Sequence, residues 1–478
     1  MIINLISEIK EKYDEIYFFL YKEEKMLIDK HFEKYVDFIN KVIETKDFRF
    51  KYGEKISIVL EENNDLVELN IIGLGKKEKS DNFTLRTTIF KGVEGIKNKK
   101  IAVISESIES GKLVAESILF SEYKFDKYKE KSKEEKNNLN ELEVSLLGNI
   151  SLEELNEAIS IRDGVFLARN LVNEPANVIY PETLAIETVK ASEKYGFTVD
   201  VYDEEKIKEL GMEAFLAVSR AAHYRPKLIV MKYLGDPTSS ELIGLVGKGL
   251  TYDTGGLSLK PSTSMDTMKS DMGGAATVIG ALSIIASQKI KKNVVAVVAA
   301  CENSIGGNAY RPGDIIGTMQ GKTIEVLNTD AEGRLTLVDA IHYIINNEKA
   351  TKIVDIATLT GAALVALGTT TTAAISNNDE FYKMVEEASN LSDERLWRLP
   401  NFPEYGKLLE SKIADLKNIG GKYAGTITAG MFIEKFVGKT PWVHLDIAGT
   451  SWTDAPYDFY TYGGTGQIVK TLYNLIKL

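Results

Sequence analysis

Two carboxylates and an arginine stand close together in the stretch NTDAEGRL, residues 328–335. Asp330 and Glu332 are two positions apart, and side chains at i and i+2 of an extended segment point to the same side. Gly333 would let the backbone turn sharply, and Arg334 would open the next helix. This spacing predicts that the two carboxylates converge on one point, where they could bind a cation.

Two other segments carry charged residues where we expect the ends of strands or the starts of helices. The segment GKGLTYDTGGLSLKP, residues 247–261, comes at the end of the strand-like run ELIGLVG and offers Lys248, Asp253 and Lys260. The segment MKSDMGGAA places Asp271 just before a glycine-rich helix start. Three loops are therefore expected to bring three Asp, one Glu and two Lys to one edge of a sheet.

Carboxylates that crowd together must be neutralised by protons or by cations. Two divalent metal ions that share bridging carboxylates would neutralise these acids, and such pairs activate water and stabilise an oxyanion in hydrolysis. An acidic loop edge with salt-bridged lysines explains the same spacing equally well, so the residues alone leave both interpretations open.

Histidine chemistry is poorly supported by the sequence. We expect His342 on a helix face and His444 in a structural role at the end of an apolar strand. The four histidines lie far apart and none matches HExxH, which disfavours a histidine zinc site and a Ser-His-Asp triad. Any metal site would therefore rely mainly on oxygen ligands.

Composition indicates an ordinary globular protein. The chain has 478 residues, of which 44% are hydrophobic and 27% charged, and this length favours two or three domains. We expect no membrane span, no secretory signal and a cytoplasmic location. The single cysteine, Cys301, is expected to be buried and inert. The net charge of −11 disfavours a role in nucleic-acid binding, although a local basic patch stays open.

The distribution of charged residues and of expected helices and strands suggests where the domains divide. Residues 1–150 are expected to form an N-terminal α/β domain, with the charge run KYKEKSKEEKNNLNE near its end as a solvated loop or helix face, or else a nucleic-acid patch. Residues 151–175 are expected to form a linker helix, which Ser151 and Glu154 open with a capping box. Residues 176–478 would then be the larger, catalytic domain.

Short apolar segments alternate with helical ones in the second part of the chain. The strand candidates are ELIGLVG, NVVAVVAAC, TIEVL, KIVDIA and WVHLDI, and the helix candidates include GGAATVIGALSIIASQ and GRLTLVDAIHYIINN. This alternation predicts an α/β fold with a mostly parallel sheet flanked by helices. In such sheets ligands bind at the carboxyl ends of the strands, which is where the acids are expected.

NTDAEGRL, VGKGLTYDTGGLSLKP and MKSDMGGAA together resemble the M17 leucyl aminopeptidase family, the cytosol aminopeptidases. The resemblance covers most of residues 160–478, and further landmarks occur in the expected order: RNLVNEPANVIYPETLA, NAYRPGDII, IATLTGA, IADLKNIGG and HLDIAG. Residues 1–150 show no comparable motif. The sequence departs from the family pattern mildly at Tyr252 and Thr254, and also around residues 220–222 and 304–306. These departures affect the expected pocket shape and side-chain preference, but not the metal site.

The resemblance implies two metal sites. One tight site would use Lys248, Asp253, Asp271 and Glu332, and a second, more exchangeable site would use Asp253, Asp330 and Glu332, with a backbone carbonyl of Asp330. Lys248 would have to be neutral, against a reference pKa of ~10.4, and two nearby cations would drive off its proton. The alternative for Lys248 is a salt bridge to Asp253. The ions implied are Mn²⁺ or Zn²⁺, with Mg²⁺ or Co²⁺ also compatible.

The resemblance also implies roles for three other side chains. Lys260 would stay charged, polarise the scissile carbonyl and stabilise the gem-diolate. Arg334 would hold a bicarbonate ion that serves as general base. The alternative role for Arg334 is an ion pair with one of the carboxylates. Met268 matches a position that lines the pocket for the first side chain of the substrate, although a core methionine fits it nearly as well.

The reaction implied is removal of an N-terminal residue, leucine or another mainly apolar one, from a peptide with a free N-terminus. A hydroxide that bridges the two metals would attack the carbonyl, and the role would be intracellular peptide turnover. The family forms hexamers, so we expect a homohexamer. Alternatives are a DNA-binding accessory or regulatory protein, a dipeptidase specialised for cysteinylglycine, and an inactive homologue, which the intact ligand positions disfavour.

Overall fold

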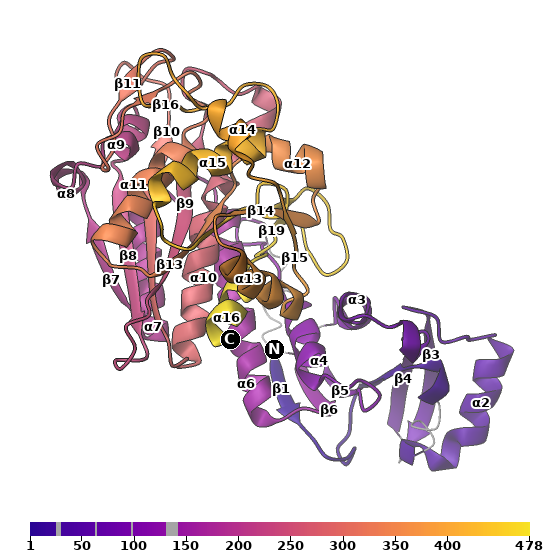
Figure 1. Ribbon diagram of the computed structural model, residues 1–478. Coiled ribbons are helices and arrows are strands. Elements are labelled where there is room, and N and C mark those ends of the chain that lie inside the picture. The colour runs from indigo at the N-terminus through magenta and orange to yellow at the C-terminus, as the bar shows by residue number, and fades with distance from the viewer. Residues whose placement is uncertain (25–29, 63–64, 97–98, 131–141) are drawn as a thin grey trace. The chain divides into compact units, whose positions relative to one another are not determined.

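The computed structural model describes residues 1–24, 30–62, 65–96, 99–130 and 142–478. The chain divides into two compact units (Figure 1). The smaller comprises Met1–Arg162 with Pro456–Thr461, and the larger comprises Asp163–Ala455 with Tyr462–Leu478. Most of the predicted charge run, residues 131–141, lies outside the described residues.

The smaller unit contains a six-stranded sheet in the order β1-β6-β5-β2-β4-β3, parallel except for the antiparallel pair β3–β4. Its strands are β1 (Ile2–Leu5), β2 (Glu15–Leu20), β3 (Lys55–Glu62), β4 (Asp65–Gly73), β5 (Lys100–Ile104) and β6 (Glu143–Leu147). Its described helices are η1 (Lys22–Glu24), η2 (Glu33–Tyr35), α2 (Val36–Thr45), η3 (Lys77–Lys79), α3 (Asn82–Val93) and α4 (Gly111–Phe120).

Strand β2 shows why this unit has a core on each face of its sheet. Every residue of its sequence EIYFFL is buried, as expected for a strand covered on both sides. Phe18 belongs to a cluster that includes Ile39 of α2, whereas Phe19 belongs to a second cluster that includes Leu85 of α3 and Leu113 of α4. Successive side chains of a strand point to opposite faces, so one strand supplies both cores.

A single long helix, α6 (Leu152–Asn173), follows the smaller sheet. The predicted capping box at its start is confirmed, because the Ser151 amide donates to Glu154 Oε2 at 2.8 Å and the Glu154 amide donates to Ser151 Oγ at 3.2 Å. The helix ends at Asn173, the first residue of the proline-containing segment NEPANVIYP, and α7 (Pro181–Tyr195) begins at the second of its prolines.

The larger unit contains an eight-stranded sheet in the order β15-β14-β17-β13-β9-β10-β8-β7. Its four central strands, β17, β13, β9 and β10, run parallel, and antiparallel pairs occur towards the edges. The strands are β7 (Thr198–Tyr202), β8 (Lys227–Leu234), β9 (Ile243–Asp253), β10 (Asn293–Asn303), β13 (Lys352–Ala357), β14 (Thr371–Ser376), β15 (Arg395–Arg398) and β17 (Trp442–Asp446). The predicted two-domain α/β fold with a mostly parallel sheet is confirmed.

Helices and short elements complete the larger unit. The helices after α7 are α8 (Glu204–Glu209), α9 (Glu213–Ser219), η4 (Ser262–Ser264), η5 (Met268–Met272), α10 (Gly273–Ser287), α11 (Gly333–Asn346), α12 (Gly361–Leu367), α13 (Asp379–Leu391), α14 (Pro403–Lys407), α15 (Gly425–Val437) and α16 (Val469–Lys477). The short strands are β11 (Ile315–Ile316), β12 (Ile324–Glu325), β16 (Leu416–Lys417), β18 (Trp452–Thr453) and β19 (Gly463–Gly464).

Two strand predictions need correction. The run TIEVL was expected to be a strand of the central sheet, but only Ile324–Glu325 forms a strand, and it pairs with β11 and β16 in a separate three-stranded sheet. The run ELIGLVG was expected to end before a loop that carries Lys248. Instead β9 continues to Asp253, so Lys248 lies inside the strand, where its backbone hydrogen bonds hold it firmly.

Helices cover both faces of the central sheet. Val246 and Leu250 of β9 belong to one buried cluster with Leu335 of α11 and Phe432 of α15. On the other face a Cβ at Gly247 would lie only 2.6 Å from the Gly274 carbonyl oxygen of α10. The helical segment Met268–Ser287 is long and apolar enough to span a membrane by length and composition, but 94% of its apolar window is buried inside the unit. It therefore has the burial of a core helix.

Candidate metal centre and active site

The carboxyl ends of parallel strands β9, β10 and β13 meet at one edge of the central sheet. β9 ends at Asp253, which pairs in register with Asn303 at the end of β10, and Thr358 follows directly after β13. This is the edge at which open α/β sheets bind their ligands. The segments that carry Asp271 and Glu332 come to the same edge, each leading into a buried helix, α10 or α11.

Lys248 is the centre of one buried group of charges. Its Nζ lies 2.7 Å from Asp271 Oδ1 and 3.0 Å from Glu332 Oε1, and it donates to the Thr358 carbonyl oxygen at 2.9 Å. Lys248, Asp271 and Glu332 are each at most 5% exposed. The alternative predicted for Lys248, a salt bridge to Asp253, is not the arrangement found, because Asp253 pairs with another lysine.

That second lysine is Lys260, whose Nζ lies 2.9 Å from Asp253 Oδ2 and 2.5 Å from Asp330 Oδ1. Asp253, Asp330 and Glu332 each offer one oxygen atom, and these three atoms lie within 4.8 Å of one another. The structure therefore brings together all five predicted metal ligands and Lys260, although they come from segments up to 84 positions apart in the sequence.

The convergence of Asp330 and Glu332 has a different cause from the one predicted. Asp330 lies in a turn, and Glu332 has helical backbone angles, φ −83° and ψ −35°, as the N-cap of α11, so the segment is not extended. Gly333 does not adopt a positive φ. The Lys248 side chain passes so close to the backbone at this position that a Cβ would lie 2.4 Å from Lys248 Cε. Glycine is therefore needed at position 333 to make room for the lysine.

The centre carries more negative than positive charge, since four carboxylates face two lysines. Burial, followed by the charge of Asp253, raises the pKa of Glu332 to about 8. Burial also raises the pKa of Asp271 to about 6. For Lys248, burial lowers the pKa, but Asp271, Glu332 and Asp253 outweigh it and the net shift is upward. A neutral Lys248 therefore requires other cations beside these carboxylates.

The residues of the centre fit divalent metal ions. Asp271 Oδ2 and Glu332 Oε2 are buried and have no hydrogen-bond partner among the described residues. Buried carboxylate oxygens are normally hydrogen-bonded or coordinated to a cation, so these two atoms are suited to bind metal ions. Oxygen ligands of this kind suit Mg²⁺ and Mn²⁺ and are also used by Zn²⁺.

Arg334 lies on the first turn of α11, where the structure buries it. Its Nη1 donates to the carbonyl oxygen of Asn418 at 2.7 Å rather than to a carboxylate, so the predicted ion pair is not found. Its Nε has no hydrogen-bond partner among the described residues, and burial lowers its pKa to about 10. A buried guanidinium with an unused donor fits a small anion.

The other predicted residues are placed as follows. Met268 begins η5, three residues before Asp271, and is half-buried, so its role in the substrate pocket stays a prediction. His444 is fully buried, and its Nδ1 lies 2.6 Å from Asp355 Oδ1, in keeping with the structural role predicted for it. Cys301 is buried within β10 as predicted.

Sequence reasoning missed the polar residues that hold the carboxylates. Thr358 Oγ1 donates to Asp271 Oδ1 at 2.7 Å, and Asn303 Nδ2 donates to Asp253 Oδ1 at 2.8 Å. Both are polar residues at or just after the end of an apolar strand, which is the signal that could have found them. Such partners fix the orientation of metal ligands.

The comparisons with known proteins agree with this geometry. Residues 166–473 match the model of the cytosol aminopeptidase family, catalytic domain, and residues 19–132 match the model of the N-terminal domain of the same family. The chain belongs to the cytosol aminopeptidase family, M17.

Relatives and solved structures extend over nearly the whole chain. A probable cytosol aminopeptidase of Clostridium perfringens is 48% identical and covers 96% of this chain and 99% of its own length, and one of Fusobacterium nucleatum is 45% identical and covers 100% and 99%. A mutant of tomato leucine aminopeptidase is 31% identical with a TM-score of 0.88, covering 100% of this chain and 96% of its own. The bottromycin maturation enzyme BotP in complex with Mn is 29% identical with a TM-score of 0.86, covering 97% and 99%.

These matches identify the class of enzyme. The protein is a metal-dependent aminopeptidase, a hydrolase that acts on peptides. The manganese in the BotP structure belongs to that protein, and its relevance here lies in the shared family and in the acidic centre described above.

Proposed function

We propose that this enzyme removes leucine and other, mainly apolar, N-terminal residues from peptides through a centre of two divalent metal ions. The observation that carries the proposal is a group of four buried or half-buried carboxylates that two lysines only partly neutralise. Two of these carboxylates have an oxygen without a hydrogen-bond partner in the part of the chain that the structure describes. A free α-amine is a metal ligand and an acylated one is not, so this centre favours exopeptidase action.

The ligand sets are proposed residue by residue. Lys248, Asp253, Asp271 and Glu332 would hold one ion, and Asp253, Asp330 and Glu332 would hold the other, with Asp253 and Glu332 common to both. When bound, the ions supply Lewis-acid activation of water and of the scissile carbonyl. Mn²⁺ or Zn²⁺ are the proposed ions, and Mg²⁺ or Co²⁺ fit the same donors.

Lys260 supplies a fixed positive charge at the reacting carbonyl. Burial lowers the pKa of Lys260, but Asp253 and Glu332 outweigh it and the net shift is upward, so the side chain stays charged at neutral pH. Its Nζ is held between Asp253 and Asp330 and 16% of the side chain is exposed, which leaves the ammonium open to a substrate. A preorganised cation stabilises an oxygen that becomes negatively charged during attack on the carbonyl.

Arg334 is proposed to hold a bicarbonate ion through its Nε, which has no partner in the described ranges of the chain. The bicarbonate would supply the proton acceptor that the side chains of the motif do not provide, since its carboxylates are engaged as metal ligands. The support for this step is that Arg334 is buried, lies two positions after Glu332, and is bound to no carboxylate among the described residues.

The setting of the enzyme is proposed from its relatives. Their names as cytosol aminopeptidases support a cytoplasmic location and a role in intracellular peptide turnover, and the family resemblance supports a homohexamer. We propose residues 1–150 as the N-terminal domain, 151–175 as a linker helix and 176–478 as the catalytic domain.

The test is hydrolysis of leucine p-nitroanilide by metal-stripped protein refilled with Mn²⁺, with N-acetyl-leucine p-nitroanilide as the matched control substrate. Cleavage of the free-amine substrate alone, and only after refilling, is the expected result. Equal cleavage of both substrates would mean that the amine is not a required ligand, and the proposed mechanism would be wrong. Cleavage of neither would exclude leucine as a substrate residue.

A further inference from the structure

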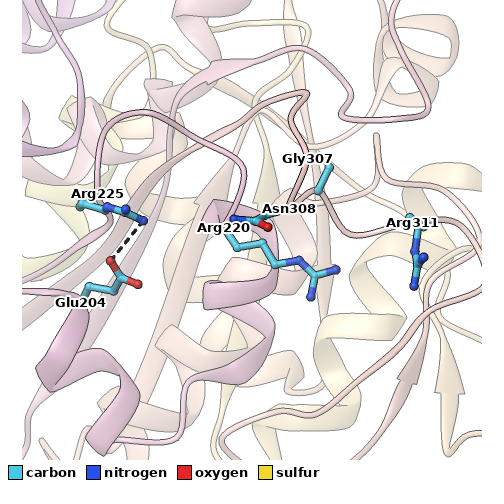
Figure 2. Close-up of a pocket in the computed structure, with 7 residues that line it drawn as sticks. Glu204, Arg220, Arg225, Gly307, Asn308 and Arg311 are labelled. Carbon is cyan, nitrogen blue, oxygen red and sulfur yellow. Dashed lines mark ion pairs between the residues drawn. The ribbon is translucent and has the colours of Figure 1, made fainter.

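A pocket on the larger unit is lined by three arginines that the metal centre does not use. It has a volume of about 530 Å³, within the range of small-molecule sites. Figure 2 shows Arg220 between the Arg225–Glu204 pair and Arg311. The arginines come from three segments, the end of α9, the turn before β8 and the loop after β10.

The carboxylates near the pocket neutralise its arginines only in part. Arg225 lies 3.6 Å from Glu204, whereas Arg220 and Arg311 share Asp314, at 3.2 and 3.0 Å. The three arginine side chains are 44%, 68% and 70% exposed, in the order Arg220, Arg225 and Arg311. The carboxylates are more buried, 26% exposed for Glu204 and 19% for Asp314, but the exposed arginine ends of these ion pairs stay open to an incoming anion. Each guanidinium also has five N–H donors, more than these contacts use.

A second cavity of about 360 Å³ adjoins the first and shares Glu204, Arg220 and Arg225 with it. Its own lining includes the aliphatic residues Leu216, Pro226 and Ile316, together with the charged residues Lys208 and Glu213. The combined space therefore has a cationic end and a second end with an aliphatic wall. Pockets that combine an apolar wall with a few convergent polar groups are typical of sites for small organic molecules.

The cationic end fits a phosphate group better than a carboxylate. A phosphate monoester has three terminal oxygens and a charge of about −1.5 to −2 at neutral pH, so it can accept from several guanidinium groups at once. A carboxylate has two oxygens, which a single arginine fork satisfies. Three arginines around one space therefore provide more donors than a carboxylate can use.

We propose that this pocket binds a small phosphate monoester with an apolar organic part. The phosphate would lie among Arg220, Arg225 and Arg311, and the organic part would enter the adjoining cavity. Glu204 would accept a hydrogen bond from a hydroxyl or amine of the ligand. The site is separate from peptide hydrolysis, since none of the proposed metal ligands lines either cavity.

The test is calorimetric titration of phenyl phosphate into the full-length protein loaded with Mn²⁺. We expect one binding event per chain that Arg220→Gln and Arg225→Gln each weaken about 10- to 100-fold, because each removes a charge-assisted hydrogen bond. Hydrolysis of leucine p-nitroanilide by Arg225→Gln should be unchanged, and both variants should unfold at the temperature of the wild type, which shows that they are folded. Arg398→Gln is the matched control, an arginine of the same unit paired with Asp379 outside both cavities, and it should leave binding unchanged.

Several results would overturn the proposal. Phenyl phosphate that does not bind, or that binds equally well to Arg220→Gln and Arg225→Gln, would show that the pocket is not its site. If phenyl phosphate inhibits hydrolysis and binds the wild type and both variants with the same affinity, it binds at the metal centre. Benzoate bound equally tightly with the same arginine dependence would indicate a carboxylate site. A short DNA duplex bound in preference, with strong salt dependence, would indicate a nucleic-acid surface instead.

Discussion

Replacing Gly333 by alanine tests whether the close approach of Lys248 to the start of α11 builds the metal centre. The new Cβ would lie 2.4 Å from Lys248 Cε and 2.7 Å from Nζ, whereas carbon atoms pack at about 3.5–4.0 Å. The lysine side chain would have to move by more than about 1 Å, because the three atoms nearest to the new Cβ all belong to it. Its contacts with Asp271 and Glu332, at 2.7 and 3.0 Å, cannot survive such a shift.

The expected magnitude follows from two opposing effects. Alanine is the better helix former by about 0.5–1 kcal/mol, whereas overpacking a dense site costs about 1–3 kcal/mol, so the variant should be somewhat less stable than the wild type. The loss of activity should be larger, because a displacement of about 1 Å at a catalytic centre can reduce the rate about 100-fold. We expect kcat/KM for leucine p-nitroanilide to fall by about that factor at saturating Mn²⁺.

A matched control is available in the same unit. Gly406 also lies in a helix, α14, and a Cβ there would meet Met431 Cε at 3.5 Å, which is an ordinary contact. Gly406→Ala should keep full activity and full metal content. If Gly333→Ala also bound two metals per chain with wild-type activity, the proposed ligand geometry around Lys248 would be incorrect.

Three other predictions concern charge at the centre. Lys260→Met should reduce kcat about 100- to 1,000-fold while both metals stay bound, because it removes the cation but no proposed ligand. Arg334→Ala should reduce kcat about 100- to 10,000-fold and abolish any stimulation by bicarbonate that the wild type shows in carbonate-free buffer. The metal-stripped protein should unfold at a lower temperature at pH 8 than at pH 6. Burial raises the folded-state pKa of Glu332 to about 8 and of Asp339 to about 7, so the folded state binds more protons in this window and loses stability as they leave.

Each of these predictions has a result that contradicts it. Loss of metal from Lys260→Met, measured by elemental analysis, would make the lysine a structural part of the centre. A bicarbonate response that Arg334→Ala retains would place the base elsewhere. Higher thermal stability of the stripped protein at pH 8 than at pH 6 would mean that Glu332 is ionised in the folded state without a metal.

The residues of the site were largely predictable because their chemistry is local in sequence. The acids and lysines of the site lie in three short segments, NTDAEGRL, GKGLTYDTGGLSLKP and MKSDMGGAA. The strand and helix patterns around these segments place most of the residues at one edge of the sheet. The structure confirms that these residues converge, but the cause of the convergence differs in part from the predicted one. Asp330 and Glu332 converge through a turn into α11, since the strand before them is two residues long and belongs to a small separate sheet.

The partners of those residues could not be predicted in the same way. Lys248 donates to the carbonyl of Thr358, 110 positions away, and Arg334 to that of Asn418, 84 positions away. Every residue has a backbone carbonyl, so the residue type does not indicate which carbonyl will accept a hydrogen bond from a distant side chain. The arginine pocket has the same character, because Arg220 and Arg311 share Asp314 only after two segments 94 positions apart are brought together.

The sequence by itself determined the class of fold, the capping of α6, the burial of Cys301 and the set of side chains able to hold metal ions. These follow from residue type and short-range periodicity, which local geometry converts directly into helices and strands. Only the tertiary structure decided that Lys248 lies within a strand, that Gly333 must lack a side chain and that Arg334 stays free of the carboxylates. Those properties are distances between segments remote in sequence, and they exist only once the core has packed.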